Sequence, residues 1–204
     1  QQAQQQKGVG SGSGSGGVMA ETKDSEERRN EFVEAAEKLF REHGIVDTTI
    51  NSIVKEMNVA KGLFYYYFKS KDDVIDAISE KYNELFNEMM NASMDKDTYE
   101  ERLEQYITNC VHSFRVLTRQ VEGEDVDLTP LSSRSIEEAK KVSIDGLCDL
   151  FEEGMKDGTL QFVHPKYYAD ILISGILTLV EEKEAGDDEI KDIIIDLIER
   201  SGKD

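Results

Sequence analysis

The chain has 204 residues, of which 38% are hydrophobic, so it is long enough to bury a core. Its 24 basic residues are outnumbered by 43 acidic ones, which gives a formal net charge of -19 at pH 7. A surface with this overall charge repels nucleic acids and anionic membranes, so either partner is excluded unless one region reverses the sign locally.

The two cysteines, Cys110 and Cys148, stand far apart in apolar contexts. No C-x-x-C pair and no Cys/His spacing favours a disulfide framework or a zinc site, so we expect free thiols, no metal and no cofactor. No apolar run reaches the ~18 residues that a membrane span requires, and no signal peptide precedes the folded part. These features predict a soluble cytoplasmic protein without a membrane partner.

The first 18 residues, beginning QQAQQQKGVGSGSGSGG, are rich in Gln, Gly and Ser and hold almost no large apolar residue. Such a composition cannot repay the entropy of ordering. We therefore predict that residues 1–18 are a disordered tag or linker, with Met19 as the native start.

From Ser25 onward the hydrophobic spacing is helical nearly everywhere, which predicts an all-α fold. A first helix is expected to open near Glu26 and to stop at Gly44. Its apolar stripe follows the i, i+4, i+7, i+8 pattern and consists of Phe32, Ala36, Leu39 and Phe40.

Three helices and their caps follow in close succession. Thr49 can cap a short helix that ends near Met57, and Asn58 suits the left-handed turn after it. A third helix is expected over Lys61–Tyr67, and Ser70 opens a capping box before a long fourth helix. The third helix contains the aromatic run LFYYYF, which propensity alone would make a strand. A lone strand would have no partner, whereas a helix turns Phe64 and Phe68 inward.

A short helix, an Asn-centred turn and a second short helix have the spacing of a helix-turn-helix, whose second helix enters the DNA major groove. The local charge agrees, because residues 48–71 have a net charge of +3, from Lys55, Lys61, Lys69 and Lys71 against Glu56. Lysines and tyrosine hydroxyls suit phosphate oxygens. Each tyrosine could equally be half-buried against the first helix.

Here the sequence resembles the TetR family of transcriptional regulators. The matching segments are FVEAAEKLFREHG and DTTINSIVKEMNVAKGLFYYYFKSKDDVI, which together cover residues 32–75. The resemblance implies a homodimer with a helix-turn-helix head over residues 23–70 and a helical ligand-binding and dimerisation domain over residues 71–204.

The resemblance also implies roles for individual residues of the head. Phosphate contacts would come from Thr49, Tyr65, Tyr66 and Lys71. Base edges would be approached by Asn51, Lys61, Gly62 and Leu63, and Tyr67 could serve either role. Two positions depart from the family pattern. Ala60 replaces the usual Ser or Thr cap, a loss of about 0.5–2 kcal/mol. The bulkier pair Leu63 and Phe64 leaves the preferred base sequence open.

The second half of the chain is interpreted from pattern and analogy. A helix opened by Pro165 and a last helix with an isoleucine-rich face resemble the family's dimer interface, although a core within one chain is the alternative. A small-molecule effector would bind among the middle helices, where methionine and aromatic side chains suit an apolar ligand. The candidates, each of which could instead be plain core, are Phe86, Met89, Met90, Tyr106, Cys110, Phe114, Phe151 and Met155.

The predicted function is that of a transcriptional regulator that binds a pseudo-palindromic DNA operator. We expect a repressor that a small-molecule effector releases. An enzyme is disfavoured, because neither a Ser/His/Asp set nor a nucleotide-binding glycine motif is present. A helical protein-interaction adaptor without DNA binding is the alternative, favoured by 13 basic against 29 acidic residues after residue 82.

Overall fold

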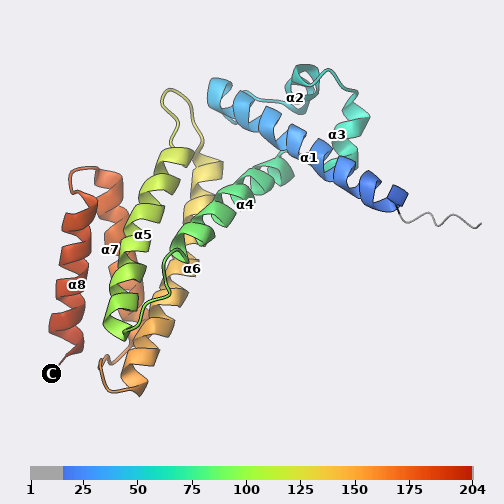
Figure 1. The fold of residues 1–204 in the computed structure, drawn as a ribbon. Coiled ribbons are helices and arrows are strands. Elements are labelled where there is room, and N and C mark those ends of the chain that lie inside the picture. Colours follow the sequence, from blue (N-terminus) through green and yellow to red (C-terminus); the bar gives the residue numbers. More distant parts are fainter. Residues whose placement is uncertain (1–15, 204) are drawn as a thin grey trace, which may run out of the picture.

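The computed structural model describes residues 16–203, with side chains from Asp24 onward, and this part of the chain is helical without strands. Figure 1 shows a small head formed by the first three helices, a fourth helix that leads away from it, and a body built from the remaining four. The helices are α1 (Gly16–His43), α2 (Ile50–Glu56), α3 (Lys61–Tyr67), α4 (Lys71–Met90), α5 (Tyr99–Val121), α6 (Thr129–Lys156), α7 (Pro165–Glu182) and α8 (Asp187–Gly202).

The turns of the head are placed by local chemistry. Gly44 adopts a φ of +82° and its N–H donates to the Phe40 carbonyl at 2.8 Å, which ends α1. Thr49 and Ser52 form a reciprocal capping box at the start of α2. Asn58 has a φ of +53° between α2 and α3. The predicted stop, cap and turn are therefore confirmed.

Two helix starts differ from the expectation. Helix α1 begins at Gly16 instead of near Glu26, because no glycine or proline interrupts the sequence between Val18 and Glu26. Residues 1–15 lie outside the described residues, so the linker prediction stays open there, whereas residues 16–18 belong to the helix.

The helical spacing of apolar residues predicts a helix over Ile136–Lys156, but helix α6 already begins at Thr129. Its second residue is Pro130, which the first turn of a helix tolerates, and the Asp127 carboxylate accepts the Thr129 N–H at 2.8 Å. Thr129 and Pro130 therefore form the first turn of α6 and are not part of the preceding loop.

The body is a bundle in which α5 packs against α4, α6, α7 and α8. Its interior contains closely packed aromatic rings, such as Phe86 and Phe114 with centroids 5.1 Å apart. Among the described residues, every helix is too short or too polar to cross a membrane.

Candidate nucleic-acid interface

Helix α3 is anchored to α1 by aromatic packing. Phe64 and Phe68 are buried, and both rings contact Phe32 at centroid distances of 5.9 and 6.3 Å. The aromatic run is thus a helix, as the pattern required. Ala60 at its N-cap makes no side-chain hydrogen bond, so the interior contacts hold this short helix in place without a cap.

The opposite side of α3 faces solvent. Tyr65 and Tyr66 are 50% and 75% exposed, and Lys61 and Gly62 are exposed beside them. A Cβ atom added to Gly62 would meet nothing within 4 Å. Packing within the protein therefore does not explain the glycine, whereas close approach of another molecule would.

Two other predicted contacts of α3 are only half exposed. Tyr67 lies between the Phe32 ring, at a centroid distance of 5.7 Å, and the Tyr66 ring, at 4.9 Å. Leu63 is partly buried against the core. Both side chains help to seat α3, so only part of their surface remains for a partner.

Helix α2 presents Thr49 and Asn51 on the exposed surface. The Thr49 hydroxyl already accepts the Ser52 N–H at 3.1 Å, and it retains a second lone pair for a further contact. The side chain of Asn51 makes no such hydrogen bond within the part of the chain that the structure describes.

Lys71 has an internal role that the sequence did not reveal. Its ammonium group donates to the carbonyls of Ile45, at 2.7 Å, and Thr48, at 3.1 Å. These bonds tie the first residue of α4 to the loop before α2. One of its three donors remains for a phosphate. The partners are carbonyls that no side-chain pattern marks, so no sequence signal could have identified them.

The head keeps its positive charge available. Glu56, the only acid among residues 48–71, is paired with Lys38 of α1 at 2.5 Å. Within residues 24–203, neither Lys61 nor Lys55 nor Lys69 forms an ion pair. Three lysines of this segment therefore lack counter-ions among the described residues, so the segment has a charge opposite in sign to that of the whole chain.

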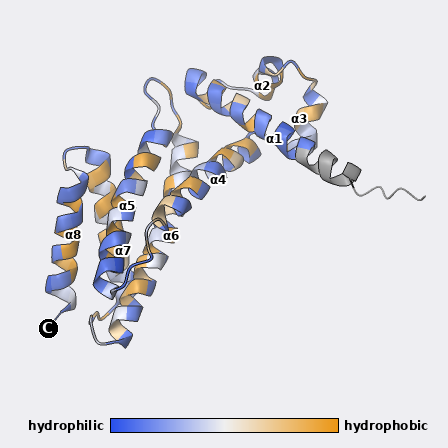
Figure 2. Cartoon of the chain, viewed as in Figure 1, coloured by the Kyte–Doolittle hydropathy of each residue, from blue (hydrophilic) through white to orange (hydrophobic). Residues whose placement is uncertain are grey.

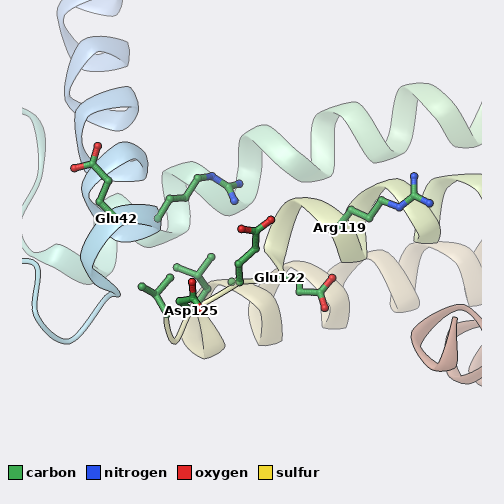
Figure 3. A pocket seen from close by; sticks show the side chains of 9 residues that line it. Glu42, Arg119, Glu122 and Asp125 are labelled. Atoms are coloured by element: carbon green, nitrogen blue, oxygen red, sulfur yellow. The ribbon is translucent and has the colours of Figure 1, made fainter.

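A cleft of about 520 Å³ lies between the end of α1 and the end of α5 with the loop that follows it. Figure 3 shows Glu42 of α1 on one side of it and Glu122 and Asp125 on the other. Beside this cleft, Arg41 donates to the Gln120 carbonyl at 2.6 Å and also to the Tyr82 hydroxyl. Arg41 was missed in the sequence, where a basic residue in a last helical turn is an ordinary feature.

The predicted effector-binding residues line no described cleft. Six of the eight are buried and two are half-buried, and they pack as interior side chains of the body. Five clefts on the described surface are lined by other residues. The prediction of a ligand site at these positions stays open. The half-buried pair is Met89 and Met155, and the buried residues are Phe86, Met90, Tyr106, Cys110, Phe114 and Phe151.

The sequence of the head is similar to those of known regulatory proteins. The family model described as bacterial regulatory proteins, tetR family, matches residues 32–78. The HTH-type transcriptional regulator HbdR of Aromatoleum sp. (strain CIB) is 34% identical over 104 residues, which are 51% of this chain and 40% of HbdR. The chain spans less than half the length of the curated relatives that it matches.

Solved structures share the fold over most of the chain. The flavonoid-responsive regulator FrrA superposes with a TM-score of 0.68 at 19% identity, covering 87% of this chain and 97% of FrrA. The fatty acid degradation regulator FadR of Bacillus halodurans gives 0.60 at 20% identity, covering 84% and 94%. Residues 32–78 thus match the model of the tetR family of bacterial regulatory proteins, and the helical fold of the chain is shared with solved structures of regulators.

Proposed function

We propose that this protein is a sequence-specific DNA-binding transcriptional regulator of the cytoplasm. The observation that carries the proposal is the exposed face of α3, where Gly62 leaves room for a close approach and two tyrosine hydroxyls lie beside unpaired lysines. Lysine and tyrosine supply phosphate contacts, and a helix of this kind reads base edges in the major groove.

The proposed operator is pseudo-palindromic because the proposed regulator is a homodimer. Figure 2 shows hydrophobic residues along α7 and α8, and several of their side chains are exposed in the single chain. Of the last helix's isoleucine-rich stripe, Ile190, Ile194 and Ile198 are buried within the chain, whereas one edge is exposed. With the exposed residues of α7 this edge forms an apolar patch, made of Tyr167 (66% exposed), Ile171 (71%), Ile193 (48%) and Leu197 (43%).

Two copies joined through this apolar patch would present two heads on one side of a DNA duplex. Successive major grooves lie about 34–36 Å apart, so the distance between the two α3 helices controls binding. An effector that binds the body better when the heads are misplaced would release the DNA by its difference in affinity. We therefore propose a repressor that a small molecule releases.

The experiment that tests DNA binding is a fluorescence-anisotropy titration with the DNA upstream of the protein's own gene, at two salt concentrations. The native protein is compared with a Lys61→Ala/Tyr66→Phe variant and with Lys96→Ala, which removes an exposed charge from the turn after α4. Tight, salt-sensitive binding that only the first variant loses would support the proposal. Equal loss in both variants, or no binding to any sequence in a random-site selection, would contradict it and favour the adaptor function.

A further inference from the structure

Helix α5 carries three polar residues at intervals of seven along one side: Tyr99, Tyr106 and Ser113. The Tyr99 hydroxyl donates to the Leu150 carbonyl of α6 at 2.6 Å. The Tyr106 hydroxyl donates to the Ser143 carbonyl, one heptad earlier on α6, at 2.9 Å. The two phenol groups thus donate hydrogen bonds to the backbone of the antiparallel helix α6 in the same way.

Each of these two tyrosines, Tyr99 and Tyr106, lies over a glycine of α6. A Cβ atom on Gly146 would lie 2.2 Å from the Tyr106 hydroxyl oxygen. A Cβ atom on Gly154 would lie 2.5 Å from the Tyr99 hydroxyl oxygen. Because both distances are far below van der Waals contact, the tyrosine ends occupy space that only glycine leaves free.

The third position breaks the pattern. Ser113 is completely buried, and its hydroxyl has no hydrogen-bond partner. A buried hydroxyl without a partner is costly and calls for an explanation. The rise of an α-helix places Ser113 about 10 Å along α5 from Tyr106, on the same side of the helix.

Completely buried apolar side chains lie on this stretch of α5 and on α4. Cys110, one turn from Tyr106, is completely buried, and so are Phe114 and Phe86. Burial raises the pKa of the Tyr106 phenol, so the group remains a hydrogen-bond donor at neutral pH. The polar groups at the two ends are therefore an acceptor carbonyl held by Tyr106 and the unsatisfied hydroxyl of Ser113.

We propose that the effector site of this protein is closed by the Tyr106 ring, and that it binds a flat, uncharged, mostly apolar molecule bearing a hydroxyl group. When the ring swings away from Gly146, the hydroxyl of the ligand replaces the phenol as the donor to the Ser143 carbonyl. A ligand about 10 Å long reaches Ser113 with a second polar group. This inference rests on the proposed regulatory function, since only there is such a ligand an effector.

An uncharged ligand follows from the surroundings. Burying an ionised group without a partner is strongly unfavourable. The charged residues that act on the Tyr106 phenol are Asp145 and Asp149, both acidic and both exposed on α6. An anion would be repelled by them, and a cation would find no carboxylate among the buried residues named above.

The glycines provide a matched pair of variants to test the closure. In a Cys148→Ser background, which leaves one thiol, Gly146→Ala displaces the Tyr106 ring beside Cys110. Gly154→Ala displaces Tyr99 at the far end of the same helix pair. We expect N-ethylmaleimide, followed by mass spectrometry, to label Cys110 about tenfold faster in Gly146→Ala and at the parent rate in Gly154→Ala.

If Gly146→Ala does not fold, Tyr106→Phe provides a second test of the proposed closure. It removes the bond to Ser143 without adding volume, so the ring opens more often and labelling accelerates by a smaller factor. Equal labelling rates in the Gly146 and Gly154 variants, or an unchanged rate in Tyr106→Phe, would overturn the proposed closure.

The ligand class is tested with 2-naphthol, and naphthalene is the control without a hydroxyl. Fluorescence titration should show saturable binding of 2-naphthol. The binding should be about tenfold tighter in Gly146→Ala than in Gly154→Ala, because the displaced Tyr106 ring already leaves the site open in the first variant. Naphthalene should bind more weakly than 2-naphthol, and bound 2-naphthol should protect Cys110 from labelling. Absence of saturable binding to Gly146→Ala, or no preference for the hydroxyl, would overturn the ligand class.

These measurements do not depend on DNA, so the two proposals can fail separately. If the native protein binds an operator but the glycine variants behave alike, the regulatory function stands and the Tyr106 site is wrong. If labelling and ligand binding follow the expectation but no DNA sequence is bound, the site stands as a ligand site and the regulatory function is wrong.

Discussion

The ammonium group of Lys71 lies 2.7 Å from the carbonyl oxygen of Ile45, to which it donates a hydrogen bond across 26 residues of sequence. A second bond, to the Thr48 carbonyl, makes Lys71 a tie between α4 and the loop that positions α2. Any rotation of α4 relative to the head must either break these two hydrogen bonds or move the loop before α2 together with the helix. Lys71 therefore couples α4 mechanically to the proposed DNA-binding face.

Removing this tie should weaken the fold. Lys71→Met deletes two charge-assisted bonds and should lower the free energy of unfolding by about 1–3 kcal/mol. Urea denaturation followed by circular dichroism measures the change. Lys69→Met, which removes an exposed lysine two residues earlier, is the control and should stay near the native value. Equal stability of the two variants would mean that Lys71 contributes only through its charge.

Gly62→Ala should separate stability from DNA binding. The new Cβ meets nothing in the protein, and alanine is favoured over glycine in a helix by about 0.5–1 kcal/mol, so thermal unfolding should shift upward. Because the methyl group would stand where we propose that DNA approaches, affinity for the operator should fall about tenfold or more. Anisotropy and thermal melting on the same variant check both signs. Unchanged DNA affinity would remove Gly62 from the interface.

The salt dependence of DNA binding should identify the lysines that meet phosphates. Lys61→Ala should reduce the slope of log K against log salt by about one per lost contact in each half-site. Lys96→Ala makes the same change of charge at the far end of the body and should keep the native slope. If both variants shift the slope equally, the effect is one of net charge and Lys61 makes no phosphate contact.

The proposed dimer should depend on the apolar patch of α7 and α8. Ile171→Asp places a carboxylate on a side chain that is 71% exposed, so the monomer should fold while the dimer dissociates. Val163, which is 89% exposed before α7, offers the control Val163→Asp. Sedimentation velocity should find a monomer only for the Ile171 variant. A native protein that sediments as a monomer at micromolar concentration would contradict the proposal.

The contact between α1 and α4 should weaken in acid. Burial alone would raise the pKa of Glu37, but hydrogen bonds from Tyr82 and Lys81, with the charges of Lys81 and Arg41, lower it below the ordinary value of 4.5. A lowered pKa stabilises the fold above about pH 4.5, and this stability is lost as pH falls through the folded-state value. Glu37→Gln should therefore flatten the dependence of unfolding free energy on pH below that point.

Urea unfolding at several values between neutral pH and about pH 3 measures this slope. Tyr82→Phe, which removes the 2.6 Å bond to Glu37, should flatten it partly in the native background. The same change should have no further effect on the slope in Glu37→Gln. Additive effects would show that the two side chains titrate the fold independently.

The sequence by itself determined the helices, their turns and the helix-turn-helix head. These features depend on residues close in the chain: Gly44 and Asn58 adopt left-handed conformations where they stand, and Thr49 caps the helix it precedes. The family pattern lies in the same local stretch, which is why residues 32–78 sufficed for the family match. Helix starts were less secure where proline or a missing helix breaker allowed more than one boundary, as at Thr129.

Only the tertiary structure decided what each polar side chain contacts. Lys71 finds its carbonyls, Tyr106 clasps α6, and Ser113 is left without a partner, because helices far apart in sequence are packed together. Hydrophobic spacing marked the isoleucine stripe of α8, but packing against the body buried Ile194 and left Ile193 exposed. The physical reason is that spacing fixes the direction of a side chain from its own helix, whereas burial and hydrogen bonding depend on which other helix lies there.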